Sequence, residues 1–174
     1  MENPFQVLGL PERFDLDGAA VQRGYLARAA QVHPDVVGDE DEAAVRAAQL
    51  NRARAVLISD ERRANALLEV LGGPGKEQDK SLPDGFLMEV METREAIEAA
   101  VVGGDEAERE RWVKWADGQR KAYVARVGEL FRGGSGPEQL RAVRRELNAW
   151  RYIERLIEQL GPRYDPNVSD FEGM

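Results

Sequence analysis

Short breaks rich in glycine and proline divide this chain into segments whose apolar residues recur at helical spacing. The longest break, 72–81, joins Gly72-Gly73-Pro74-Gly75 to a charged stretch and cannot continue a helix. Beyond it, clusters of glycine separate three more segments, 83–102, 105–132 and 137–160. Connections this short favour an antiparallel three-helix bundle. The chain is therefore expected to be all-α, with one helical unit before the long break and a bundle after it.

Apolar stripes predict which faces of these three segments form the core of the bundle. The last segment has the clearest stripe, which consists of Leu140, Val143, Leu147, Trp150, Ile153, Ile157 and Leu160. The middle segment contributes Trp112, Trp115, Ala116, Tyr123, Val127 and Leu130. The first contributes Phe86, Val90, Ile97 and Val101, with Leu87 at the edge of the arc. We expect these side chains to pack together, and the aromatic residues to be structural rather than part of a cofactor site.

Two amphipathic segments before the long break predict a helical hairpin. The first spans 17–32, with Val21, Tyr25, Ala29 and Val32 along one side. The second spans about 42–59, with Val45, Leu50, Ala53 and Leu57. Pro34 ends the first helix, because proline lacks a backbone N–H and disfavours helical geometry in the preceding residue. The tripeptide His33-Pro34-Asp35 is therefore expected at the exposed tip of the hairpin.

A short helix is expected in front of the hairpin. Asn3 is suited to cap its first turn, Pro4 to occupy its first position, and Gly9 to end it. Phe5 and Leu8 would then pack beneath the hairpin.

Composition argues against several classes of function. The chain has no cysteine and one histidine, so we expect no disulfide, no thiol catalysis and no protein-built metal site. Its net charge of −8 argues against nucleic acid as the main ligand. No apolar run reaches the roughly 20 residues of a membrane span, and the N-terminus lacks signal-peptide features, so we expect no membrane contact and a cytoplasmic location. No set of catalytic residues or phosphate-binding loop emerges, so neither an enzyme nor a cofactor is expected.

The hairpin resembles the J-domain of DnaJ-type co-chaperones. The resemblance rests on the short first helix, the paired helices and His33-Pro34-Asp35 between them. It also rests on the C-terminal part of the second paired helix, from Leu50-Asn51-Arg52-Ala53 to the segment 59–63. The continuation through 63–68 and 86–95 is similar to HscB, the J-protein of iron-sulfur cluster assembly. The resemblance implies four parts. They are a J-domain at 1–72, a linker at 73–82, a scaffold-binding three-helix bundle at 83–162 and a flexible tail at 163–174.

The resemblance implies that the tripeptide contacts a DnaK- or HscA-type ATPase and stimulates ATP hydrolysis. Asp35 is suited to bind a partner arginine and His33 to hydrogen-bond, while Pro34 holds both in a fixed turn. The residues expected at this contact are His33, Pro34, Asp35, Arg23 and Arg28. Family members usually present several basic residues on this surface, and the chain departs from that pattern. Arg23 is the one clearly exposed cation of the first hairpin helix, and Arg28 projects toward the packed side of that helix. Val36 stands where lysine is common in the family. A thin basic surface predicts a weaker encounter or a dedicated ATPase.

A second candidate surface lies on the first helix of the bundle. Met88 and Met91 project away from the core and lie among Glu92, Glu95 and Glu98. An apolar patch with a charged rim is typical of a protein interface. Tyr152 projects opposite the stripe of the last helix. By resemblance, the residues that bind the iron-sulfur scaffold protein IscU are Leu87, Met88, Met91, Glu92, Glu95 and Tyr152. Ala99 stands where relatives can carry a further acid, which predicts a somewhat weaker contact.

The expected function is that of a co-chaperone which stimulates a DnaK/HscA-type ATPase and delivers IscU to it for cluster transfer. The protein itself would catalyse no reaction. Two alternatives remain open: a J-domain co-chaperone for a different protein client, and a helical adaptor without coupling to an ATPase.

Overall fold

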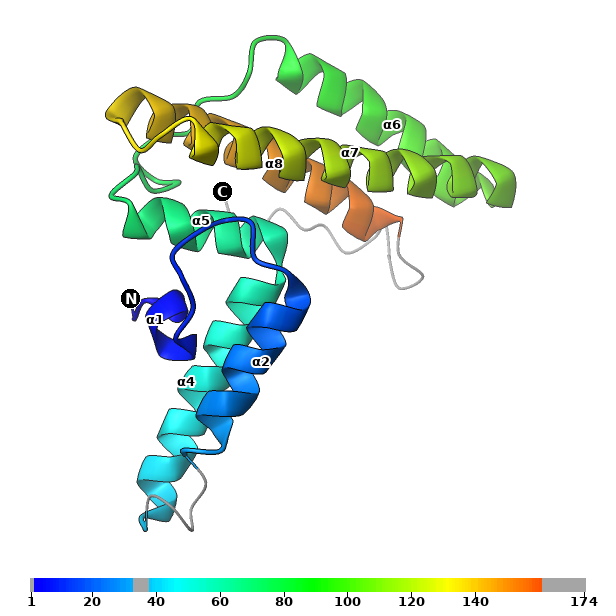
Figure 1. Cartoon of the computed structure of the whole chain (residues 1–174). Coiled ribbons are helices and arrows are strands. Elements are labelled where there is room, and N and C mark those ends of the chain that lie inside the picture. The colour runs from blue at the N-terminus through cyan, green and yellow to red at the C-terminus, as the bar shows by residue number, and fades with distance from the viewer. Residues whose placement is uncertain (1, 33–37, 161–174) are drawn as a thin grey trace.

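The computed structural model describes residues 2–32 and 38–160, and every regular element in these ranges is an α-helix. The helices are α1 (Pro4–Leu8), α2 (Gly18–Ala29), α4 (Glu40–Ile58), α5 (Asp60–Val70), α6 (Phe86–Gly103), α7 (Glu106–Arg132) and α8 (Pro137–Gln159). Figure 1 shows the α2–α4 pair projecting away from the layer formed by α6, α7 and α8, with α5 where the two parts meet. The predicted all-α class, with a helical hairpin followed by three long helices, is confirmed.

The first helix follows the sequence prediction closely. The Asn3 side chain accepts a hydrogen bond from the Phe5 amide at 3.0 Å, which satisfies a donor that an open helix end leaves free. Gly9 ends α1 in a left-handed conformation, with φ of 64°, which glycine adopts without steric cost. Phe5 and Leu8 are buried, as predicted.

The hairpin differs from the prediction in two places. α2 ends at Ala29 rather than at 32, because its last turn tightens into i→i−3 bonds that include Val32 N to Ala29 O at 3.2 Å. Val45 is 59% exposed, so its assignment to the core was wrong. It lies five residues before Leu50, and a helical rotation of about 100° per residue turns it about 140° away from that residue. Ala43 is buried instead.

α5 is a separate helix that the sequence analysis did not distinguish. The break falls at Ser59, whose extended backbone, with ψ of 122°, ends α4 and starts α5. The Ser59 hydroxyl accepts a hydrogen bond from the Arg62 amide at 3.4 Å. The apolar side of α5, through Leu67 and Leu68, is buried.

The stretch predicted as a linker is bound along α8. The guanidinium of Arg144, which is only 6% exposed, donates to Pro74 O and to Asn65 Oδ1, both at 2.9 Å. Asn148 Nδ2 donates to Asp79 O at 2.9 Å and to Ser81 O at 3.0 Å. These bonds join the N-terminal unit and the linker to the last helix of the bundle.

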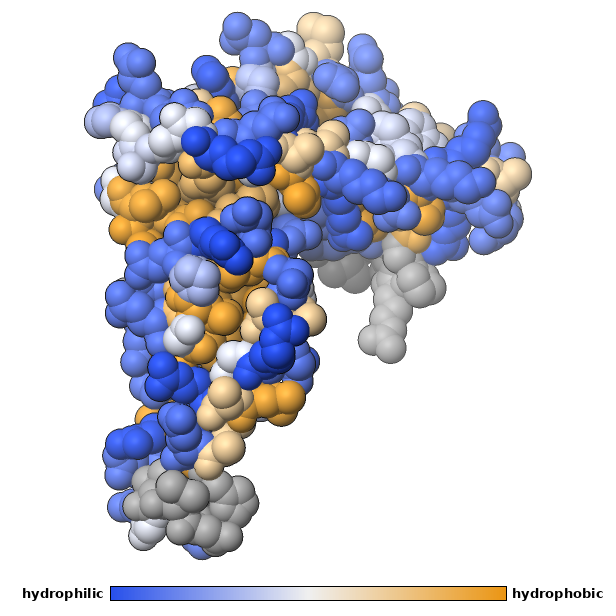
Figure 2. Space-filling model, viewed as in Figure 1, coloured by the Kyte–Doolittle hydropathy of each residue, from blue (hydrophilic) through white to orange (hydrophobic). Residues whose placement is uncertain are grey.

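Aromatic and aliphatic side chains complete this joint. The Phe14 ring, from the loop before α2, packs on the Phe131 ring of α7 with centroids 5.6 Å apart. These two rings and the side chains of Leu67 and Leu71 line a hollow between the two parts. Figure 2 shows apolar side chains gathered where α5 meets the C-terminal end of α7. The position of the hairpin relative to the bundle is therefore set by direct packing.

The bundle core follows the predicted stripes. On α8, every predicted residue is buried except Ile157, which is half-buried, and Leu156 and Ala149 widen the stripe. Trp150 stacks on Tyr123 of α7 with centroids 5.9 Å apart. Trp112, Trp115 and Leu130 are half-buried. α6 begins at Phe86, later than the predicted residue 83, after a turn in which Phe86 N donates to Pro83 O.

A polar group on α8 ties α7 to the core. Glu154 accepts hydrogen bonds from Arg120 Nη2 at 2.6 Å and from Trp150 Nε1 at 2.9 Å. Burial tends to raise the pKa of Glu154, but the hydrogen bonds from Arg120 and Trp150 outweigh it and lower that pKa. Because folding lowers the pKa of this carboxyl group, its ionised form stabilises the fold at pH values above the ordinary pKa of 4.5. This contribution is lost as the pH falls below 4.5.

We expect Glu154→Gln to lower the free energy of unfolding by about 1–2 kcal/mol at pH 7, because it removes a charge-assisted hydrogen bond. The difference from wild type should shrink as the pH falls below 4.5, where the wild-type carboxylate is progressively protonated. Urea unfolding at neutral and at acidic pH measures both values. An equal loss at both would contradict a role for the charge of Glu154.

Candidate functional site

The predicted ATPase contact His33-Pro34-Asp35, together with Val36, lies outside the described residues, but the helices on either side of it are described. α2 and α4 are held together by Tyr25 Oη, which donates to Asn51 Oδ1 at 2.9 Å, and by Arg54 Nε, which donates to Gln22 Oε1 at 2.8 Å. The last residue of α2, Ala29, and the first residue of α4, Glu40, lie at the end of the helix pair that is far from the bundle (Figure 1).

The basic residues of α2 are arranged differently from the prediction in one respect. Arg23 is exposed and makes no hydrogen bond or ion pair within the described part of the chain. Arg28 was expected on the packed side but is exposed. Its guanidinium folds back over Gly9, where an added Cβ would lie 2.7 Å from Arg28 Nη2. Arg28 therefore covers the end of α1, and Arg23 presents its charge to solvent next to an exposed Leu26.

The outer face of α6 has the predicted composition. Met88 and Met91 are 71% and 58% exposed, and Leu87, predicted at the edge of the core, is 53% exposed. Glu92 and Glu95 are exposed beside them. We call this surface, made by Leu87, Met88, Met91, Glu92 and Glu95, the methionine face. The opposite side of α6 is buried through Phe86, Val90 and Ile97.

Tyr152 approaches the methionine face from α8. Its ring meets that of Phe86 edge-on, with centroids 6.0 Å apart and an interplanar angle of 70°. Phe86 is the first residue of α6 and directly precedes Leu87. The structure thus brings Tyr152 to the end of α6 at which the methionine face begins.

No metal site and no membrane span are found in the described ranges. Among residues 2–32 and 38–160, no three acidic or histidine side chains are grouped so that they could hold a metal ion. No helix in these ranges is both long and apolar enough to cross a membrane. The predicted tail, 163–174, lies outside these ranges.

Comparison with known families matches both parts of the chain. Residues 3–66 match the DnaJ domain, and residues 82–161 match the HSCB C-terminal oligomerisation domain. The first match includes the hairpin with His33-Pro34-Asp35, and the second includes the methionine face and Tyr152.

Relatives and solved structures are similar along most of the chain. Proteins described as co-chaperone protein HscB homologs, from Burkholderia thailandensis and Burkholderia multivorans, are each 29% identical over 170 residues, which covers 94% of this chain and 95% of theirs. The chaperone HscB from Vibrio cholerae is 27% identical with a TM-score of 0.74, covering 91% of this chain and 94% of that one. Human co-chaperone protein HscB shares the fold, with a TM-score of 0.74 at 20% identity, and the match covers 92% of this chain and 81% of that one.

Proposed function

We propose that this chain, which belongs to the HscB-type J-domain co-chaperones, stimulates a DnaK/HscA-type ATPase through His33-Pro34-Asp35. We also propose that it delivers an IscU-type iron-sulfur scaffold to this ATPase for cluster transfer. The observation that carries the proposal is the pairing, in one chain, of a DnaJ-type hairpin with an exposed methionine face on a separate bundle.

The hairpin is suited to the ATPase contact because its helices hold the ends of the tripeptide segment. The hydrogen bonds between α2 and α4 hold these two helices together, so a partner that contacts both helices loses less conformational entropy on binding. Asp35 would bind a partner arginine, and Arg23 would add one cation to the approach. With Arg28 folded over Gly9, this basic surface is small, which favours an ATPase whose own contact surface is only moderately acidic.

The methionine face is suited to the scaffold contact. Methionine is unbranched and polarizable, so it adapts to an apolar partner surface, while Glu92 and Glu95 favour a partner with basic residues around that surface. Tyr152 adds an aromatic ring at the edge. Because Arg144 and Asn148 bind the linker along α8, the two partners would be held at a set separation while hydrolysis tightens the ATPase on the scaffold.

Steady-state ATP hydrolysis tests the proposal. A DnaK-type chaperone of the same organism is assayed with this protein and an IscU-type scaffold, added separately and together. We expect synergistic stimulation, and we expect Asp35→Asn or His33→Gln to reduce it at least about tenfold, since each removes a charged or hydrogen-bonded contact.

The matched control is Asp41→Asn, which makes the same chemical change on the exposed first turn of α4. It should leave stimulation unchanged. Stimulation that does not depend on the scaffold would instead indicate a different client. A complete lack of stimulation would indicate a helical adaptor and would overturn the proposal.

A further inference from the structure

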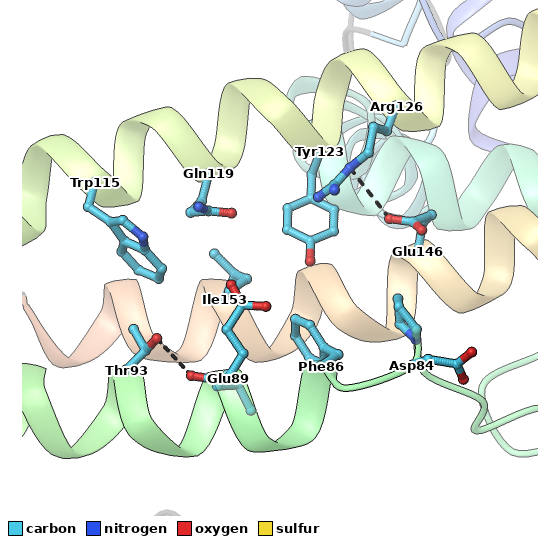
Figure 3. A pocket seen from close by; sticks show the side chains of 12 residues that line it. Asp84, Phe86, Glu89, Thr93, Trp115, Gln119, Tyr123, Arg126, Glu146 and Ile153 are labelled. Carbon is cyan, nitrogen blue, oxygen red and sulfur yellow. Dashed lines mark hydrogen bonds and ion pairs between the residues drawn. The ribbon is translucent and has the colours of Figure 1, made fainter.

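A cavity of about 160 Å³ lies between α6, α7 and α8 and was not foreseen from the sequence. Figure 3 shows its side chains. The rings of Phe86, Trp115 and Tyr123 line it, and Figure 3 shows the Tyr123 hydroxyl pointing toward α8 and α6. Carboxylates at its border come from Asp84, Glu89 and Glu146. The cavity thus combines aromatic walls with an acidic border.

The border carries excess negative charge. Glu146 is paired with Arg126, whose Nε lies 3.6 Å from Glu146 Oε2. Asp84 and Glu89 make no ion pair within residues 2–32 and 38–160, so the lining has two more acidic than basic side chains. Burial, with smaller contributions from Glu146 and Glu89, raises the pKa of Tyr123 to about 12 against the lowering effect of Arg126. The Tyr123 hydroxyl therefore stays protonated in a region of negative potential.

A guanidinium group already occupies one side of this border. The Arg126 guanidinium carbon lies 4.2 Å from the centroid of the Tyr123 ring, where the ring face and Glu146 attract it together. Tyr123 also stacks on Trp150, so its ring is fully engaged. The half-buried ring of Trp115 and the carboxylate of Glu89 offer the same combination of aromatic surface and acid on the other side of the cavity. Figure 3 shows that this side has no cationic side chain among the residues drawn.

The size of the cavity selects the kind of ligand. Pockets for small organic ligands span roughly 300–1,000 Å³, so this cavity holds little more than one long side chain. Arginine fits better than lysine, because its planar guanidinium stacks on an aromatic ring and pairs bidentately with a carboxylate.

Glu89 follows Met88 directly, and on a helix it lies about 60° around the axis from Glu92. A protein bound to the methionine face therefore has a short path to the cavity.

We propose that this cavity receives an arginine side chain of a protein bound over α6, with the guanidinium on the Trp115 ring and paired with Glu89. The proposal rests on the proposed function only for the place where that protein docks. It adds a site on the side of α6 that faces α7, and this site would help to select partners with a suitably placed arginine.

The test uses N-acetyl-L-arginine amide titrated into the full-length protein and followed by NMR. We expect saturable shifts at the Trp115 indole N–H and at the amides of Glu89 and Thr93. Glu89→Gln should weaken binding about five- to tenfold, because it removes the charged hydrogen-bond acceptor on the Trp115 side of the cavity. Glu110→Gln, an exposed position on α7 outside the cavity, is the matched control and should bind as the wild type does.

The uncharged analogue N-acetyl-L-citrulline amide separates charge from shape. We expect it to bind at least about tenfold more weakly than the arginine compound, since it keeps the planar group but lacks the cation. Equal binding of the two compounds, equal binding by Glu89→Gln, or shifts that do not saturate would each overturn the proposal. Neither an ATPase nor a scaffold is present, so a negative result here would leave the proposed function standing.

Discussion

Arg63→Ala is expected to lower the free energy of unfolding by about 3–5 kcal/mol, because it removes a buried cation that satisfies two backbone carbonyls. The Arg63 side chain is only 5% exposed. Its Nε donates to Phe14 O at 2.8 Å and its Nη1 to Leu57 O at 2.7 Å, and it is also paired with Asp60. Without the guanidinium, both carbonyls would be left in the interior without a donor.

The effect should reach beyond the hairpin. The Arg63 guanidinium lies 5.2 Å from the centroid of the Phe14 ring, and Phe14 packs on Phe131 of α7. Urea unfolding followed by circular dichroism measures the loss. The matched control is Arg62→Ala, at the exposed neighbouring position, which should change the unfolding free energy by less than about 0.5 kcal/mol. Similar losses for the two variants would contradict a central role for Arg63.

Met88→Ala combined with Met91→Ala is expected to weaken binding of an IscU-type scaffold by about 100-fold. Truncation of two central apolar side chains of an interface typically costs about 1–2 kcal/mol each. Both methionines are well exposed, so the free energy of unfolding should stay within about 0.5 kcal/mol of wild type. Titration calorimetry with the scaffold measures the affinity, and urea unfolding measures the stability.

A pair of exposed valines provides the control for this variant. Val102, at the far end of α6, and Val113, on α7, are exposed apolar residues outside the methionine face. Val102→Ala with Val113→Ala should leave scaffold affinity unchanged. Stimulation of the ATPase without scaffold should also survive the methionine substitutions. If it were lost together with scaffold binding, the two contacts would not be separable and the two-site proposal would be wrong.

Local signals predicted most of the helices correctly. Asn3 caps the first turn of α1, as predicted, and Asp17 and Asp105, at which two predicted segments start, cap α2 and α7. The stripe on α8 identified its buried side, and the projection of α6 correctly placed Met88 and Met91 in solvent. The reason is that capping and amphipathic periodicity act over one to two helical turns, so they can be read from neighbouring residues.

Projection failed where the deciding contact lies elsewhere in the fold. Arg28 was placed on the packed side but is exposed, because its long side chain can fold over Gly9 without being buried. The separate helix α5 begins where the backbone of Ser59 becomes extended, in a stretch without glycine or proline. Arg63 and Arg144 were not assigned to the core, since a periodic pattern of apolar residues gives no reason to bury a cation.

The sequence by itself determined the all-α class, the ends of most helices, the place of His33-Pro34-Asp35 between two of them, and the exposed methionines. Tertiary structure alone decided how the hairpin sits on the bundle, how the linker runs along α8, and where the cavity beside Glu89 opens. These features depend on partners far apart in the chain. Arg63 and Phe14 are 49 residues apart, and Arg144 and Asn65 are 79 apart. No local pattern specifies such pairs, because their contact arises only when the helices pack.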